Sequence, residues 1–375
     1  MILLVVVVPA LVGIYKLAVF LLMLSLLIVL HEYGHFIVAR RNGVRVNDFA
    51  VGFGPTLLKW TSTRSGTNYR INAIPLGGYC AMQGEDGKTS EALQHKTAPA
   101  LEGDNFQNKS VWQRLAIVLA GPIANFVLAF AILLFSALFI GLPQPDVSTT
   151  LGALQPGQPA DRAGMQSGDR IVSINGKPVS TGTAMVETIH ASPNRPLQIT
   201  FDHKGIVKTV TVTPTERTSG GKKMGFIGFS TVQLIKRVNP LEAVQASWQT
   251  FYAMISGTIA MLIGLFIHPQ AAAENLSGPI GIYRIAMQVQ DLGWAPYFAL
   301  AATISISLGI FNLFPIPALD GGRAAFFVAE ILRGKPVDPE KEAMVHMVGF
   351  AVLMMLMLFV SYHDVANIFN HKGVL

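Results

Sequence analysis

Four long apolar stretches set the strongest limit on what this chain can fold into. They cover residues 15–39, 112–142, 294–316 and 344–360. Each is close to or above the roughly 20 residues that an α-helix needs to cross the hydrocarbon core of a bilayer. Charged residues make up only 13% of the chain, whereas a soluble domain carries about 25%. The sequence therefore predicts a polytopic α-helical membrane protein with about four transmembrane helices.

The lysines and arginines lie in short blocks beside these stretches. They gather between the first and second stretches and again between the third and fourth. The positive-inside rule places both loops in the cytoplasm, so the segment between the second and third stretches lies outside. A net charge of +6 distributed in this way is typical of topology signals rather than of a phosphate-binding face. We therefore expect the lipid bilayer as a partner and no nucleic acid.

A fifth apolar stretch, residues 248–268, is long enough to span the bilayer. If it crossed, the basic loop at residues 323–341 would lie outside, against the positive-inside rule. We expect it to lie along the outer interface or to dip in without crossing. Gly257, Gly264 and Pro269 would suit such an irregular segment.

The outer segment, residues 145–231, is polar and has strand-like alternation. Residues 197–213 read as two strands around a turn at residues 203–205, and residues 184–191 read as a short helix. This pattern predicts one inserted α+β domain. The flanking regions are an N-terminal membrane region (1–142), an interfacial helix with its connecting loop (232–293) and a C-terminal membrane region (294–375). Residues 46–79 read as short strands of a β-hairpin with its turn at residues 64–66.

The pattern HEYGH at residues 31–35 carries metal chemistry. On a helix, His31 and His35 share one face, so both imidazoles can bind one zinc ion. Glu32 lies where it can take a proton from a water molecule at the metal. Ionisable groups inside an apolar stretch are costly in a bilayer and usually functional. A histidine pair bonded to other polar groups of the bundle is the structural alternative.

Zinc in a catalytic site needs a third protein ligand. Asp320 is the best candidate, since it follows the third apolar stretch on the same side as His35. An Asp-Gly pair also occurs simply as a turn or a helix cap. Glu330, His268 and His363 are weaker candidates.

Together these segments resemble the site-2 proteases, in particular the bacterial regulator-of-sigma-E type. The resemblance rests on HEYGH at 31–35, GPIAN at 121–125, SGPI at 277–280 and, above all, NLFPIPALDGG at 312–322. The outer segment resembles a PDZ domain through GMQSGDRIVSINGKPV at 164–179. The best-known enterobacterial members carry two such domains in tandem, whereas this segment has room for one.

The resemblance implies one Zn²⁺ per chain, an endopeptidase reaction and a place in the bacterial cytoplasmic (inner) membrane. It implies that His31, His35 and Asp320 hold the zinc and that Glu32 is the catalytic base and acid. The active site would lie near the cytoplasmic side and the PDZ-like domain outside. The implied substrates are single-pass membrane proteins of the anti-sigma-factor type, with signal-peptide remnants as a second class.

The resemblance also implies that a few further residues bind the substrate, namely Asn312, Pro315 and Pro317. A spanning helix hides its carbonyls in hydrogen bonds, and an unwound one needs new partners, since each freed group costs several kcal/mol in lipid. The resemblance places the strands of the 46–79 region at the membrane surface, as a membrane-associated β-hairpin that could pair with an extended substrate or merely cover the site. The PDZ-like domain could capture a carboxy terminus or act as a steric filter.

Two other functions fit parts of the pattern. A catalytically silent membrane scaffold would use the PDZ-like domain, but it would have no need of Glu32. A metal-handling membrane protein such as a transporter should show repeated halves and polar residues in several spans, and neither is visible in the sequence.

Overall fold

The structure is a computed structural model that describes residues 2–85, 104–219, 222–267 and 278–369. The chain divides into two compact units. The membrane unit comprises residues 1–136 and 244–375, and the inserted domain comprises residues 137–243. Each unit is described by itself.

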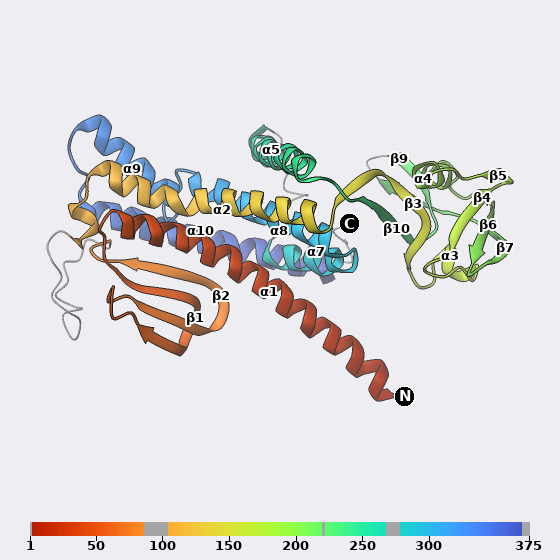
Figure 1. The fold of residues 1–375 in the computed structure, drawn as a ribbon, viewed down its shortest axis with the longest axis horizontal. Helices are drawn as coiled ribbons and strands as arrows, with labels where there is room; N and C mark the ends of the chain where they lie inside the picture. Colours follow the sequence, from red (N-terminus) through yellow and green to blue (C-terminus); the bar gives the residue numbers. More distant parts are fainter. Residues whose placement is uncertain (1, 86–103, 220–221, 268–277, 370–375) are drawn as a thin grey trace. The chain divides into compact units, whose positions relative to one another are not determined.

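The membrane unit is a helix bundle with one β-hairpin region (Figure 1). Its helices are α1 (Ile2–Arg41), α2 (Val111–Phe139), α5 (Pro240–Ile267), α7 (Pro279–Asp291), α8 (Trp294–Leu313), α9 (Asp320–Arg333) and α10 (Pro339–Phe369), with a 3-10 turn at Phe106–Asn108. Within the described residues, four helices are long and apolar enough to cross a membrane: Leu11–Arg41, Val111–Phe139, Trp294–Leu313 and Glu340–Tyr362. They confirm the four helices expected from the apolar stretches.

Helix α1 ends in a turn that redirects the chain into the hairpin. Gly43 adopts a φ of +68°, and its N–H donates to Arg40 O at 3.1 Å while Val44 N–H donates to Ala39 O at 2.9 Å. This is the Schellman arrangement, in which a left-handed glycine satisfies the last carbonyls of a helix. The side chain of Val44 is buried and anchors the start of the first strand.

The hairpin strands β1 (Val46–Thr61) and β2 (Asn68–Met82) bend back on themselves. Asp48 pairs with both Ala81 and Asn68, so the first half of β1 has a partner on each side. The expected hairpin is therefore present, but its strands are longer than expected and form four antiparallel segments. The final segment of β2 runs beside α1, where Ser25 Oγ donates to the Pro75 carbonyl.

Helix α8 is packed on two sides by other helices of the bundle. On one side Tyr297 and Ala301 pack against Phe20 and Leu27 of α1. On another side a second cluster joins α8 to α2 and α5, with members Ala129, Leu133, Leu262, Ala302, Ile306 and Ile310. Ser305, fully buried in α8, donates its hydroxyl to the Asn125 carbonyl of α2 at 2.8 Å.

The fifth apolar stretch, residues 248–268, forms most of helix α5. Its glycines led us to expect an irregular segment, but the segment is a regular helix. Helix α5 is one continuous helix of 28 residues, and an added Cβ at Gly257 or Gly264 would meet nothing within 4 Å. In Figure 1, α2 and α8 are seen lengthwise and α5 nearly end-on, so α5 runs across these helices rather than alongside them. Both glycines are thus regular positions of the helix and not breaks in it. Residues 268–277, which include Pro269, lie outside the described residues.

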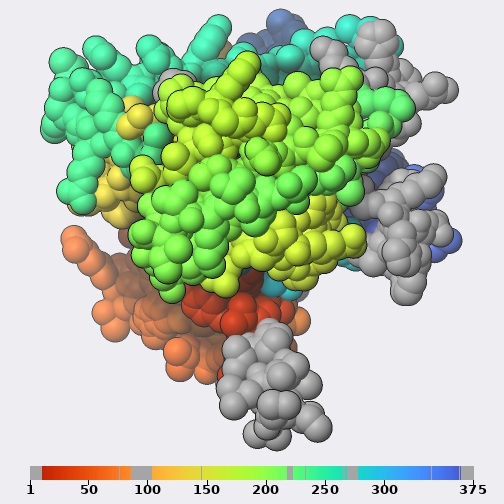
Figure 2. All heavy atoms as spheres, turned by 90° about the vertical axis from the view of Figure 1, so that its right-hand side faces the viewer, coloured from red at the N-terminus to blue at the C-terminus, as the bar shows by residue number. Residues whose placement is uncertain are grey.

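The inserted domain is an α+β fold whose atoms form one compact body (Figure 2). Its sheet has the order β10-β3-β4-β6-β7, with β5 paired to β4 and a separate β8–β9 hairpin. The elements are β3 (Leu142–Leu154), α3 (Pro159–Arg162), β4 (Arg170–Ile174), β5 (Lys177–Pro178), α4 (Gly182–His190), β6 (Leu197–His203), β7 (Ile206–Val212), β8 (Thr215–Ser219), β9 (Lys222–Phe226) and β10 (Phe229–Lys236).

Two local predictions for this domain are confirmed. Strands β6 and β7 form a hairpin whose turn residues Lys204 and Gly205 have φ of +51° and +87°, as a two-residue turn between twisted strands requires. The short helix expected at residues 184–191 is α4. Chain entry and exit lie side by side, because Pro143 of β3 pairs with Ile235 of β10.

The crosswise course of α5 predicts that the chain does not cross the bilayer between α2 and α8. A Leu292→Cys variant lacking Cys80 should then react with a membrane-impermeant maleimide added to intact spheroplasts, because residue 292 is exposed and would lie on the outer side, just before α8. The matched control is Leu332→Cys, also exposed, which should react only after permeabilisation. Labelling of Leu292→Cys only after permeabilisation would mean five crossings.

Candidate metal centre

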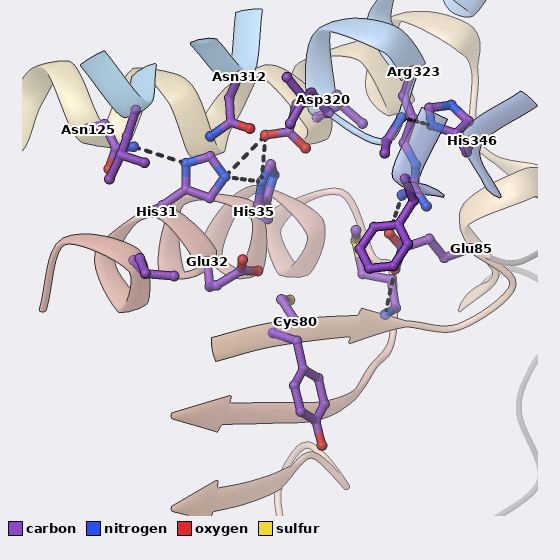
Figure 3. A pocket seen from close by; sticks show the side chains of 18 residues that line it. His31, Glu32, His35, Cys80, Glu85, Asn125, Asn312, Asp320, Arg323 and His346 are labelled. Carbon is purple, nitrogen blue, oxygen red and sulfur yellow. Dashed lines mark hydrogen bonds and ion pairs between the residues drawn. The ribbon is translucent and has the colours of Figure 1, made fainter. Parts of the chain in front are cut away.

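Three potential metal ligands from two distant parts of the chain meet inside the membrane unit (Figure 3). His31 and His35 project from one face of α1, and Asp320 is the first residue of α9. Asp320 Oδ2 lies 3.1 Å from His31 Nε2 and 3.3 Å from His35 Nε2. The two Nε2 atoms are 3.2 Å apart. The three atoms therefore form a nearly equilateral triangle.

The tautomer of His35 follows from its other ring nitrogen. His35 Nδ1 lies 2.8 Å from the Ile117 carbonyl of α2. A carbonyl only accepts, so Nδ1 carries the proton and donates it. Neutral His35 then has a lone pair at Nε2 and directs it at the centre of the triangle. A histidine that binds a metal usually donates its other N–H in this way.

His31 has the corresponding contact with Asn125, which is fully buried in α2. As drawn, Asn125 Nδ2 lies 3.2 Å from His31 Nδ1 and Asn125 Oδ1 has no hydrogen-bond partner. Exchanging the amide N and O, which amide geometry allows, lets Oδ1 accept from His31 Nδ1–H. The buried oxygen then has a partner, and His31 too directs the lone pair of Nε2 at Asp320.

The donor set fits zinc. Two imidazole nitrogens and one carboxylate oxygen are common zinc ligands, with bonds of about 2.0–2.1 Å, so a tetrahedral ion separates its ligand atoms by about 3.3–3.4 Å. The observed separations of 3.1–3.3 Å are close to this spacing. Three lone pairs of this kind attract a cation.

Glycines let helices α1 and α2 approach closely. A Cβ added to Gly121 of α2 would lie 2.2 Å from His35 Nε2 and 2.8 Å from His31 Cε1. A Cβ added to Gly34 of α1 would lie 2.3 Å from the Ala120 carbonyl. Both distances are far below any real contact, so no other residue fits there without moving the imidazoles or the helices.

Glu32 lines the same cavity of about 520 Å³ as the three ligands. It projects from α1 towards β2 and Cys80 (Figure 3), and an added Cβ at Gly78 of β2 would lie 3.8 Å from Glu32 Cγ. Burial raises the pKa of the Cys80 thiol, with further contributions from Glu32 and Glu85. Cys80 is therefore a neutral thiol, and Glu32 supplies a carboxyl group beside it on this wall.

Of the three expected substrate-binding residues, one lines the cavity and two lie in a loop beside it. Asn312 lines the cavity beside Asp320 (Figure 3). Pro315 and Pro317 lie in the loop between α8 and α9 and are not among the residues that line the cavity. Pro317 packs instead against Gly349 of α10.

The weaker ligand candidates contribute nothing in the described residues. Glu330 accepts from Arg114 Nη2 at 2.7 Å, which ties α9 to α2. His268 and the side chain of His363 lie outside the described residues.

Sequence reasoning assigned no role to α2 at this site. The sequence shows only that Ile117, Gly121 and Asn125 are spaced four residues apart and so share one helix face, and this spacing does not identify the partner that the face meets. The Ile117 carbonyl accepts from His35 and the Asn125 amide contacts His31, while the missing side chain of Gly121 leaves room for both imidazoles. The contact of His346 with the loop before Asp320 has no comparable sequence signal.

Comparisons with known proteins agree with this geometry. The family model described as Peptidase family M50 matches residues 19–356. A Rhizobium meliloti (strain 1021) protein named as a zinc metalloprotease is 36% identical over 370 residues, covering 95% of this chain and 98% of the relative. The zinc metalloprotease RasP of Geobacillus kaustophilus is 32% identical over 418 residues, covering 93% and 97%.

Among solved structures, the PDZ domain of the SdrC-like protein from Listeria monocytogenes matches 24% of this chain and 92% of its own, with 18% identity and a TM-score of 0.20. A score this low supports no argument about the inserted domain. The family match and the full-length relatives are sufficient without it. The chain belongs to peptidase family M50, the site-2 protease family, and is a zinc metallopeptidase with apolar helices suited to a membrane.

Proposed function

We propose that this protein is an intramembrane zinc endopeptidase that hydrolyses peptide bonds in or near the transmembrane segments of single-pass membrane proteins. The observation that carries the proposal is that Asp320 of α9 meets the two imidazoles of α1, one of the most apolar of the described helices, with a mean hydropathy of 2.5 across its candidate span. A carboxylate and two imidazoles at that place have a large energetic cost unless they bind something.

One zinc ion per chain would be held by His31, His35 and Asp320. When bound, zinc supplies Lewis acidity towards water and towards the scissile carbonyl. Asn125 and the Ile117 carbonyl keep the two imidazoles in the required tautomer and orientation.

Glu32 would act as the general base and then as the general acid. Its carboxylate takes the proton from the attacking water as the oxygen bonds to the scissile carbon. It then gives that proton to the amide nitrogen as the carbon–nitrogen bond breaks. Its place on the wall formed with β2 leaves the cavity between it and the ligand atoms for the substrate.

Substrate presentation would use the groups around the cavity. Asn312 has both a donor and an acceptor for the backbone of an unwound segment. Residues 78–82 of β2 pair with β1 on one side only, so an extended substrate could add along the side nearest Glu32. Pro315 and Pro317 would act by shaping the loop that carries Asp320, since neither lines the cavity.

For the cell we propose the bacterial cytoplasmic membrane, with the site near the cytoplasmic side and the inserted domain outside. Anti-sigma factors are the proposed substrates, with signal-peptide remnants as a second class. We propose that the inserted domain is a PDZ-like filter, admitting only substrates whose outer part has already been removed.

The first test separates metal binding from proton transfer. Glu32→Gln should leave zinc content unchanged and lower the cleavage rate of a membrane-peptide reporter by at least about 100-fold, the usual scale of general acid–base catalysis. His31→Ala, His35→Ala and Asp320→Ala should each lower zinc content and activity together. Elemental analysis and peptide cleavage by purified protein measure the two effects. Substantial activity in Glu32→Gln would refute the assigned mechanism.

The second test uses the space at Gly121. Gly121→Ala places a methyl group 2.2 Å from His35 Nε2, so zinc affinity should fall by at least about tenfold, the lower end of what altered ligand surroundings cost. Gly257→Ala is the matched control, because its added Cβ would meet nothing within 4 Å. Competition with a zinc-selective chelator measures the affinity. Equal affinities of the two variants would show that α2 does not pack against the imidazoles as described.

The third test concerns the inserted domain. Residues 146–233 can be replaced by a short Gly-Ser linker, because Val147 and Gln233 are paired neighbours. A filter predicts that the shortened enzyme cleaves full-length and pre-trimmed substrates at similar rates, whereas the intact enzyme cleaves only the trimmed one. Cleavage of both substrates is followed in proteoliposomes. Loss of cleavage of the trimmed substrate would favour capture or a folding role.

A further inference from the structure

The loop that delivers Asp320 contains a strained residue. Ala318 has a φ of +79°, in the left-handed region that residues with a Cβ rarely adopt. Such a conformation persists only when the surrounding structure holds it. Two glycines after Asp320 allow α9 to begin tightly against the loop, since an added Cβ at Gly321 or Gly322 would lie 2.2–2.4 Å from loop backbone atoms.

His346 of α10 holds this strained residue. The Ala318 N–H donates to His346 Nδ1 at 2.8 Å. Because Nδ1 accepts, a neutral ring carries its proton at Nε2, and this buried atom has no hydrogen-bond partner. The ring also lies 5.7 Å from that of Phe326 of α9. The imidazole is thus fixed between the loop and the helix that begins with Asp320.

A second contact reaches the same loop from the same face of α10. Gly349 lies three residues after His346, which places both on one side of the helix. A Cβ added to Gly349 would lie 2.4 Å from Pro317 Cβ and 2.6 Å from its carbonyl oxygen. Helix α10 therefore touches the loop at Pro317 through a close backbone approach and at Ala318 through a hydrogen bond.

These contacts stand out because α10 has little other packing. Only 6% of the apolar part of its candidate span, Glu340–Tyr362, is buried, against 22–44% for the other three candidate spans. A further attachment lies near its other end, where Asp364 accepts from the N–H groups of Gly278 and Gly281 at the start of α7. An apolar helix held at a few points can shift as a unit. Such a shift would move the loop through its contacts with Pro317 and Ala318.

We propose that His346 is a positioning residue for the metal centre: its hydrogen bond to Ala318 holds the loop in the strained form that brings Asp320 to the two imidazoles. The packing of α10 against the loop thereby controls zinc binding, although none of the three candidate ligands found among the described residues lies on α10. The inference rests on the proposed function in one respect, that Asp320 is a zinc ligand.

The test compares variants of the full-length purified protein loaded with zinc or with cobalt. His346→Leu removes the acceptor, so zinc affinity, measured against a chelator, should fall by about tenfold or more, and the visible absorption of the cobalt form should change. His346→Asn places Oδ1 where Nδ1 was and should restore both properties. Met347→Leu, at a neighbouring lipid-exposed position, should change neither.

The outcomes separate this inference from the proposed function. Wild-type zinc affinity and cobalt absorption in His346→Leu, or equal damage in His346→Leu and His346→Asn, would overturn it. Unchanged zinc affinity in Asp320→Ala, measured alongside, would instead show that the proposed metal site is wrong. If His346→Leu does not fold, Gly349→Ala disturbs the same loop with His346 intact. It should lower zinc affinity, and an unchanged affinity would overturn the inference.

Discussion

The meeting of three lone pairs between α1 and the start of α9 determines how the rest of the membrane unit must be built. Two imidazole nitrogens and a carboxylate oxygen repel one another at 3.1–3.3 Å unless a cation lies between them. The remaining polar atoms of both imidazoles have partners on α2, as buried polar groups require. The geometry for zinc binding and the packing of α1 on α2 therefore depend on the same contacts, because the α2 groups that orient the two imidazoles also hold α1 against α2.

That interface depends on small residues. In a bilayer, helices associate through close backbone approach and polar contacts, since lipid is as apolar as their side chains. Gly34 and Gly121 provide the approach from opposite sides, each pressed against atoms of the other helix. The backbone carbonyl of Asn125 also accepts a hydrogen bond from the Ser305 hydroxyl, which joins α8 to α2 beside the site. The glycine inside HEYGH is thus a packing residue for the site rather than a spacer.

Much of this arrangement could be predicted from the sequence because it depends on local periodicity. The four apolar helices, the β6–β7 turn and the shared face of His31 and His35 follow from spacing alone. Contacts between distant segments could not be predicted in this way, since periodicity gives a helix face but not the partner it meets. The role of α2 and the contact of His346 with Ala318 belong to this second class.

The site also restricts the path of the chain between α2 and α8. His35 lies near the end of α1, six residues before its last residue Arg41, and Asp320 follows the end of α8 by seven residues. Because His35 Nε2 and Asp320 Oδ2 lie 3.3 Å apart, α1 and α8 must end at the same level and run in the same direction. Helix α2 begins at that level too, since Ile117 in its second turn accepts from His35, so α2 runs the opposite way. The chain therefore leaves α2 and enters α8 at the same face. If α1, α2 and α8 span the bilayer as we propose, helix α5, which lies between α2 and α8 in sequence, makes no further crossing, and its course across α2 and α8 in Figure 1 fits that path.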